Sequence, residues 1–268
     1  MHQRLFVFLS TCLSLSLTSC VVYMPMQCAA PQITDKKQGE LTLSTYLNGR
    51  ADIAGTYSPV PHLLVRAAYS NLRDDPKPKD STYYRGHQYD VSVGTYWRLG
   101  NQWLVGALGG FGQAQSAAAY TRTGFIFGSP TRYEFDTRYN KVFGEVYGTL
   151  RATDALSFGA AYRVTQVNYT HLTNLGAPVD LSGMTRSEPM VFVRVRLGNG
   201  PTEDRPVQLQ AAWGTSATFG YNEKDPNPNS DPGVRDLKQN RGYATIGIAV
   251  FPHCLFRKAQ PLPAGNVR

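Results

Sequence analysis

The chain has 268 residues, long enough to bury a sizeable core and ordinary for a single all-β domain. Its 25 glycines, 16 tyrosines and 12 phenylalanines, with only 17% charged residues, exclude a disordered chain and a coiled coil and favour a β-rich protein. The formal net charge of +8 is spread over the chain without the basic and aromatic motif of a nucleic-acid-binding protein, so we expect no nucleic-acid partner.

The N-terminal region has the pattern of an export signal. Arg4 supplies a positive charge, and Leu5 to Leu17 is an uncharged, largely apolar run that is too short to cross a bilayer as a helix. The sequence Leu17-Thr18-Ser19-Cys20 resembles the lipobox of bacterial lipoproteins. This resemblance implies that Cys20 becomes the first mature residue and is acylated on its sulfur, so that it incorporates palmitate. A plain secreted protein, with Cys20 as a thiol or in a disulfide, is the alternative.

Most of the remaining chain alternates apolar and polar side chains with the period of two that is typical of β-strands. Leu41 and Leu43, for example, share one face of a ladder whose other face carries Glu40 and Thr42. Most ladders have room for the roughly 9 to 11 residues that a tilted transmembrane strand requires. We expect about ten strands (eight to twelve), starting near residues 39, 51, 62, 84, 102, 134, 156, 188, 206 and 241.

The connections between these candidate strands differ in length at the two ends. The short set is 59–61, 100–101, 152–155 and the somewhat longer 198–205, and the long, polar set is 73–81, 121–130, 173–187 and 219–240, with 48–50 as a short exception. Short turns at one end and long loops at the other are typical of bacterial outer-membrane barrels, whose turns face the periplasm. The pattern predicts an antiparallel, up-and-down transmembrane β-barrel.

Charges of both signs lie on the polar faces of the ladders, whereas the apolar faces are almost free of charge. In a transmembrane barrel the charged face must line the lumen, because a Lys or Arg facing mid-bilayer lipid costs about 2 to 4 kcal/mol. Buried charges need partners, so a narrow lumen favours ion pairs. The predicted lumen charge network is Glu40, Asp52, Arg66, Asp90, Lys141, Glu145, Arg163, Arg194 and Arg196. A soluble, lipid-tethered ligand-binding barrel, with an apolar interior and a charged outer face, is the alternative.

Two motifs flank the first predicted strands. The first is a Tyr-x-Pro, followed by a single Pro and then by Gly-Glu, and it leads into strand one. The second is Tyr-Ser-Pro followed by His-Leu, in the turn that joins strands two and three. The residues of these motifs are Tyr23, Pro25, Pro31, Gly39, Glu40, Tyr57, Ser58, Pro59, His62 and Leu63. They resemble the N-terminal part of uncharacterised outer-membrane β-barrel proteins of Bacteroidetes-type bacteria, although Gln38 stands where that pattern has Lys. The resemblance implies fold and location, and it brings no activity with it.

Two further cysteines flank the predicted barrel. Cys28 precedes its first strand and Cys254 follows its last. Because the first and last strands of a closed barrel are neighbours, the two flanks meet at one rim, and we predict a Cys28–Cys254 disulfide in the oxidising periplasm.

Catalytic and cofactor motifs are sparse. There is no GxSxG, HExxH, Walker A or CxxC pattern, so we expect neither a cofactor nor a metal. An enzyme related to the ten-stranded omptin proteases is one alternative, with His87, Asp74, Asp75 and Asp80 as the candidate set. A calcium loop is a second alternative, because Asp225, Asn227, Asn229, Asp231 and Asp236 have spacing similar to that of an EF-hand. Ser230 stands where such a loop needs Gly, and three prolines stiffen the segment, so a solvated extracellular loop is favoured.

The predicted organisation is a lipoprotein signal peptide over 1–19, a periplasmic tether over 20–38, the barrel over 39–252 and a periplasmic tail over 253–268. The expected role is non-enzymatic, structural or surface-interacting, in the bacterial outer membrane with a lipid-anchored N terminus in the periplasm. Expected partners are outer-membrane lipid and lipopolysaccharide, since the basic balance favours anionic head groups. The barrel-assembly and lipoprotein-processing machineries are further expected partners. A small pore is the remaining alternative.

Overall fold

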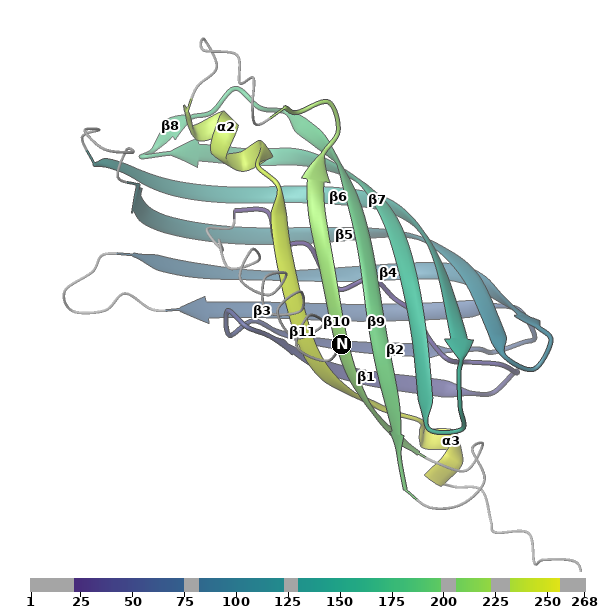
Figure 1. Cartoon of the computed structure of the whole chain (residues 1–268). Coiled ribbons are helices and arrows are strands. Elements are labelled where there is room, and N and C mark those ends of the chain that lie inside the picture. Colours follow the sequence, from purple (N-terminus) through teal and green to yellow (C-terminus); the bar gives the residue numbers. More distant parts are fainter. Residues whose placement is uncertain (1–21, 75–81, 123–129, 199–205, 223–231, 256–268) are drawn as a thin grey trace, which may run out of the picture.

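Alternating side chains give the chain ten strands that close into one barrel, with an eleventh strand of two residues in a loop (Figure 1). The computed structural model describes residues 22–74, 82–122, 130–198, 206–222 and 232–255. The strands are β1 (Gly39–Tyr46), β2 (Ala51–Tyr57), β3 (Leu64–Asp74), β4 (Tyr83–Leu99), β5 (Trp103–Arg122), β6 (Thr131–Arg151), β7 (Leu156–Asn174), β8 (Ala177–Pro178), β9 (Gly183–Leu197), β10 (Val207–Thr218) and β11 (Arg241–Val250). Two short helices are described, α2 (Pro232–Lys238) and α3 (Pro252–Leu255).

Every neighbouring pair of barrel strands is antiparallel. The first and last strands pair directly, with Leu41 opposite Val250, and this pairing closes the barrel. β8 pairs only with the end of β7 and stands outside the ring. The expected fold, an antiparallel transmembrane barrel of about ten strands, is therefore confirmed. The largest error in a predicted strand start is at β9, which begins at Gly183 rather than near 188.

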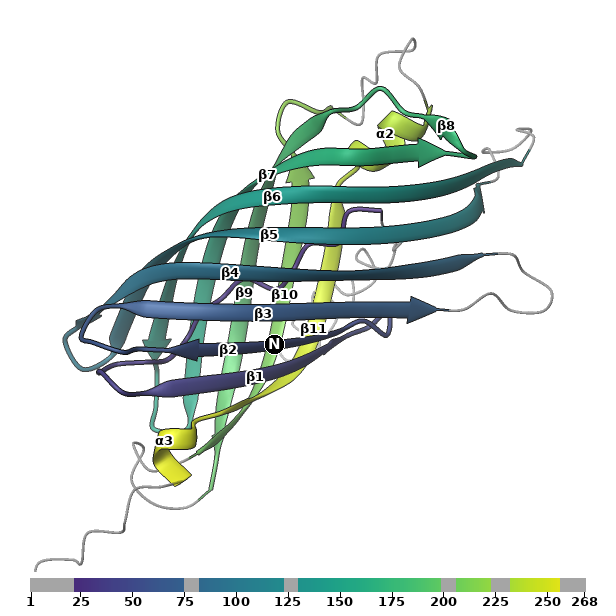
Figure 2. The same cartoon turned by 180° about the vertical axis from the view of Figure 1, so that it is seen from behind.

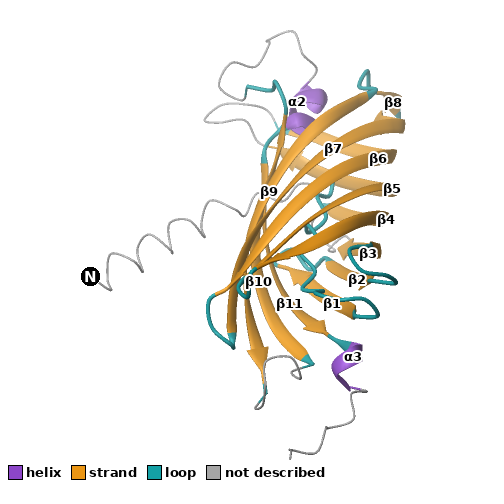
Figure 3. Cartoon of the chain, turned by 90° about the vertical axis from the view of Figure 1, so that its right-hand side faces the viewer, coloured by secondary structure: helices purple, strands orange, loops and turns teal. Residues whose placement is uncertain are grey.

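The two ends of the barrel differ as expected. At one end, here called the short-turn end, residues 58–63, 100–102 and 152–155 join consecutive strands, and β1 starts there. The opposite, long-loop end carries α2 and β8, whereas α3 lies at the short-turn end (Figures 1 and 2). The wall is uneven in height, because β4 to β7 have 17 to 21 residues while β1 and β2 have 8 and 7 (Figure 3).

An apolar belt surrounds the outside of the barrel. Its exposed members include Leu41, Leu43, Ile53, Val65, Val91, Val93, Val142, Val146, Val191, Val195, Leu209, Ile246 and Ile248. Exposed aromatic residues stand at both edges of this belt: Tyr57, Trp97 and Trp103 beside the short turns, and Tyr69, Tyr89 and Trp213 toward the long loops. A closed barrel with an apolar outer band between two aromatic girdles is an outer-membrane β-barrel. No helix in the described ranges is long and apolar enough to cross a membrane.

Glycines on the inner face make room for aromatic rings from the next strand. Gly106 is directly opposite Tyr147, and a Cβ at Gly106 would lie 2.4 Å from the Tyr147 ring. Gly159 and Phe192 repeat the arrangement across β7 and β9, where the Cβ would lie 2.2 Å from the ring. The rings therefore lie over bare backbone and fill the lumen without pushing the strands apart.

Candidate functional site

The described chain begins inside the barrel. Residues Val22 to Ile33, here called the plug, form an extended segment without regular secondary structure, and all but Gln32 are buried (Figure 2, purple). The plug contains no charged residue. Pro25 and Pro31 restrict it and its preceding residues to extended conformations, which suits a chain that passes through a narrow lumen.

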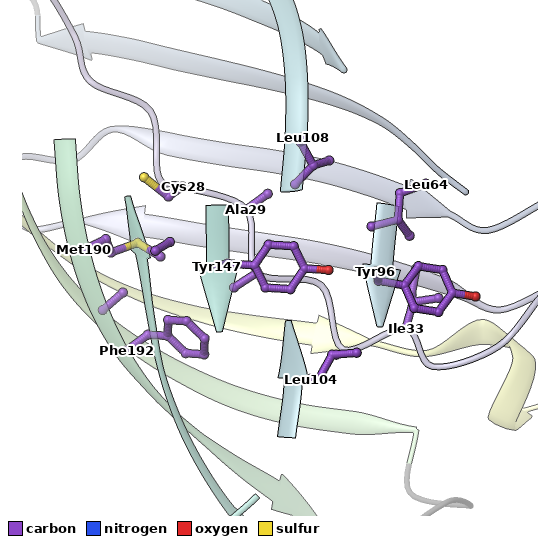
Figure 4. Packing of buried hydrophobic residues seen from close by; sticks show 13 residues of the cluster. Cys28, Ala29, Ile33, Leu64, Tyr96, Leu104, Leu108, Tyr147, Met190 and Phe192 are labelled. Atoms are coloured by element: carbon purple, nitrogen blue, oxygen red, sulfur yellow. The ribbon is translucent and has the colours of Figure 1, made fainter. Parts of the chain in front are cut away.

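The plug runs the length of the lumen. Val22 packs with Ala118 and Leu237 near the long-loop end. Cys28 and Ala29 belong to the central cluster with Met190 and Tyr147, and Ile33 lies by Tyr96 and Leu104 toward the short-turn end (Figure 4). The chain then turns back into β1 at Gly39, so the plug and β1 run in opposite directions along the barrel.

Side chains of the lumen satisfy the polar backbone of the plug. Three lumen donors bind plug carbonyls: Ser116 Oγ to Val22 O at 2.6 Å, Gln88 Nε2 to Met24 O at 2.8 Å, and Arg50 Nη2 to Pro25 O at 2.6 Å. Lumen oxygens accept from plug amides: Gln27 N donates to Tyr46 Oη at 2.7 Å, and Gln32 N to Glu40 Oε2 at 2.7 Å. A buried extended strand needs such partners, because it has no ladder of its own to pair with. The lumen is therefore built around this segment.

Glu188 on β9 is a second point of attachment. Its side chain is 0% exposed, and Oε1 accepts hydrogen bonds from Tyr23 Oη at 2.8 Å and Ser216 Oγ at 2.9 Å. Oε2 accepts from Thr165 Oγ1 at 2.9 Å. The guanidinium of Arg186 lies 5.3 Å from the centre of the Tyr23 ring. A buried carboxylate with several donors and a nearby cation is stable without water.

Among the described residues, the largest ion-pair group lies in the middle of the lumen. Arg163 Nη2 is 2.6 Å from Glu145 Oε2, and its Nη1 is 3.7 Å from Asp90 Oδ2. Lys141 Nζ is 2.8 Å from Asp90 Oδ1 and 2.9 Å from Gln88 Oε1. Because Gln88 also binds the plug, the charged group and the plug form one connected polar network.

A second ion-pair group lies around β1. Arg194 Nη1 is 3.0 Å from Glu40 Oε1, and the other oxygen of Glu40 holds the plug at Gln32. Gln32 Oε1 in turn accepts a hydrogen bond from Arg196 Nη2 at 2.9 Å. Arg66 and Asp52 line the same cavity beside the plug as Glu40 and Arg194.

All nine residues of the predicted charge network thus face the lumen, and six of them form the ion pairs described above. Sequence reasoning missed Arg50, Arg186 and Glu188. The sequence places Arg50 in the turn 48–50, where it does lie, and Arg186 in the long connection 173–187, whose last residues instead belong to β9. The missed Arg50 lies 3.4 Å from the predicted Asp52, with which it pairs.

The cavities that the described residues line beside the plug are small. Two cavities lie beside the plug, one at its middle and one toward the short-turn end, and each holds about 30 Å³. That volume accommodates about two water molecules. The arrangement suits a sealed barrel better than a solute pathway.

Two predictions about the N-terminal region are wrong. Residues 20–38 were expected to be a periplasmic tether, but the described part of this range from Val22 to Ile33 lies in the lumen. Cys28 and Cys254 do not form the expected disulfide, since Cys28 is buried inside the barrel and Cys254 lies in α3 at its end. Both errors have one cause, the expectation that the segment preceding β1 stays outside the barrel. Cys20 lies outside the described residues.

The other candidate sites are only partly described. His87 lies on the outward face of β4, whereas Asp74 ends β3 opposite Tyr84; Asp75 and Asp80 lie outside the described residues. Asp236, the last residue of the calcium hypothesis, sits in α2 and accepts a hydrogen bond from Tyr120 Oη, and Asp225 to Asp231 lie outside the described residues. Within the described ranges, no group of three His, Cys, Asp or Glu residues is arranged to hold a metal ion.

No family model and no curated protein matches this chain. Among solved structures, the chain is similar to the N-terminal β-barrel domain of Pseudomonas aeruginosa OprF (7% identity, 81% of this chain and 99% of that chain, TM-score 0.32). It is also similar to the outer membrane protease OmpT from Escherichia coli (10% identity, 81% and 91%, TM-score 0.35) and to the translocator domain of the autotransporter NalP from Neisseria meningitidis (9% identity, 80% and 86%, TM-score 0.39). The fold assignment rests on the strand pairing and outer belt of this chain itself.

Proposed function

We propose that this protein is a sealed, non-enzymatic outer-membrane lipoprotein whose long-loop end is a surface for interactions at the cell exterior. The observation that carries the proposal is the plug, which occupies the lumen from end to end and binds it through backbone and side-chain hydrogen bonds. A lumen filled by the chain's own residues supports a scaffold role over that of an open solute pathway. The alternative of a ligand-binding lumen has little support, because the cavities beside the plug are water-sized.

Conductance measurements test the sealed state. We expect purified full-length protein to show no stable single-channel openings in planar bilayers and no swelling of sugar-loaded liposomes. A variant that lacks residues 22–33 provides the matched control, and we expect it to conduct. Steady conductance by the full-length protein would support the small-pore alternative instead.

Metabolic labelling tests the lipoprotein part of the proposal. Its support is the lipobox-like sequence at Leu17 to Cys20, which stands directly before the plug. We expect membrane fractions to contain a palmitate-labelled band that shifts in mobility on heating, as folded barrels do. The Cys20→Ser variant should lose the label, and an unlabelled wild-type protein would remove the lipoprotein assignment.

Lipopolysaccharide is the proposed partner at the long-loop side of the membrane. Arg85, His87 and Arg138 are exposed on the outward face. On β4, Arg85 and His87 stand four and two residues beyond Tyr89 of the outer girdle, within about 13 Å along the strand. Basic residues just above the apolar belt are placed to meet the phosphates of anionic lipid head groups. We propose the barrel-assembly and lipoprotein-processing machineries as transient partners during export.

The non-enzymatic assignment is tested by a peptidase screen. The support is geometric, since His87 faces outward from β4 while Asp74 lies at the rim with its strand partner Tyr84. We expect no cleavage of basic peptides by purified protein in lipopolysaccharide-containing micelles. Cleavage that disappears in the His87→Ala variant would establish the omptin-like alternative.

A further inference from the structure

We infer that the plug threads the mature N terminus through the barrel to the cell surface, so that the lipid on Cys20 enters the outer leaflet rather than the periplasmic one. The lipid and the position of the mature N terminus rest on the lipoprotein assignment proposed above; the direction in which the plug crosses the lumen rests on the described residues alone.

The direction of the plug carries the inference. β1 starts at the short-turn end, and Ile33 lies in the cluster with Leu64 and Tyr96 near that end. From Ile33 back to Val22 the chain passes toward the long loops, where Val22 O accepts a hydrogen bond from Ser116 Oγ at 2.6 Å. The long-loop end of an outer-membrane barrel faces the cell exterior. The described chain therefore enters the structure from outside the cell.

The level reached by the plug supports the same conclusion. Pro25 O binds Arg50, which stands in the turn that joins β1 to β2 at the long-loop end. Phe111 is an exposed apolar residue of β5. Ser116 lies five residues farther toward the long loops, a distance of about 16 Å along the strand. Val22 is thus beyond the apolar belt on its outer side.

For a mature chain that starts at Cys20, chain length excludes a return to the periplasm. Two peptide steps separate Cys20 from Val22, and these span at most about 7 Å. The eleven steps from Val22 to Ile33 cross the lumen once and span up to about 40 Å when fully extended. A second crossing from Val22 would need a segment of similar length, which the mature chain lacks if it starts at Cys20.

Thiol labelling on intact cells tests the inference. In a Cys254→Ser background, Val21→Cys is treated with a membrane-impermeant biotin-maleimide, with Asn48→Cys in the β1–β2 turn and Asn101→Cys in a short turn as position controls. We expect Val21→Cys to be labelled on intact cells to the same extent as Asn48→Cys, and Asn101→Cys to be labelled only after the outer membrane is opened. Labelling of Val21→Cys only in opened cells would overturn the inference.

The readouts separate this inference from the lipoprotein proposal. Palmitate incorporation is measured on the same samples, and each variant must first show the heat-dependent mobility shift of a folded barrel. If palmitate is absent, Cys20 carries a thiol in every variant, and labelling of the Cys254→Ser parent on intact cells would then remove the lipid and leave the threading intact. Palmitate with labelling of Val21→Cys only in opened cells would remove the threading. If Val21→Cys does not fold, a cysteine inserted between Cys20 and Val21 repeats the measurement.

Discussion

The hydroxyl of Tyr23 donates a hydrogen bond to Glu188 at 2.8 Å and so joins the start of the plug to β9 across 165 residues of sequence. Glu188 is fully buried, and its other donors, Thr165 and Ser216, come from β7 and β10. Three neighbouring strands and the plug therefore meet at one carboxylate. The plug is an integral part of the folded barrel at this point.

Removing the Tyr23 hydroxyl should weaken the barrel measurably. We expect Tyr23→Phe to lower the free energy of unfolding by about 1.5 to 3 kcal/mol, the usual worth of a hydrogen bond to a charged group. Urea unfolding in lipid vesicles measures the effect. Tyr57→Phe, which alters an exposed girdle residue, is the control and should change little. Equal stability of the two variants would contradict the attachment of the plug to Glu188.

The ion pairs of the lumen should be far more sensitive than those at the surface. We expect Arg163→Met to destabilise the barrel by about 3 to 5 kcal/mol, because it leaves Glu145 buried without its cation. Arg132→Met removes a matched pair with Glu134, whose side chains are 40% and 46% exposed, and should cost less than about 1 kcal/mol. Gel-shift unfolding temperatures of the two variants provide the measurement, and comparable losses would count against a buried network.

Crowding of the plug should open the lumen. A Cβ at Gly86 would lie 2.5 Å from Met24 Cε, so Gly86→Val pushes against the plug from β4. We expect this variant to show conducting events in planar bilayers and to expose Cys28 to maleimide before unfolding. Gly144→Val is the control, because a Cβ at Gly144 meets nothing within 4 Å. A silent Gly86→Val channel with a protected Cys28 would show that the plug does not seal the barrel.

Charge removal at the long-loop side should weaken lipopolysaccharide binding. We expect Arg85→Gln with Arg138→Gln to reduce the affinity for lipid A in micelles by roughly thirtyfold, since each basic residue near an anionic surface contributes about 1 kcal/mol. The double variant Arg98→Gln with Arg151→Gln removes the same charge near the short turns and should bind normally. An equal loss of lipid A affinity in both double variants would indicate a general effect of net charge and would contradict a binding site at the long-loop side.

Strand periodicity predicted most of the barrel, because successive side chains of a strand point alternately to the lipid and to the lumen. Leu41 and Leu43 face lipid while Glu40 faces the lumen, and this contrast is legible in the sequence. The same contrast identified Asp90, whose partners the structure supplies from β6 and β7. It failed at Arg186, since a long polar connection was expected where β9 already runs.

The plug could not be found by periodicity, because a segment surrounded by lumen on all sides has no second environment to alternate with. Its signals were compositional: twelve residues without charge, two prolines, and a Tyr-x-Pro lead that the resemblance had already singled out. Tyr23 and Pro25 of that lead bind Glu188 and Arg50, two residues that the predicted network lacked. Without these two lumen residues, the sequence offered no partners for the polar groups of the plug.

The closing seam between β1 and β11 sets an order of assembly. The plug is continuous with β1, and the described ring of strands surrounds it. A ring that closed first would have to admit Tyr23 and two methionines, Met24 and Met26, through a passage that is now nearly full. The sheet must therefore wrap around its own leading segment, so that the ring in which Leu41 pairs with Val250 closes with the plug already in place.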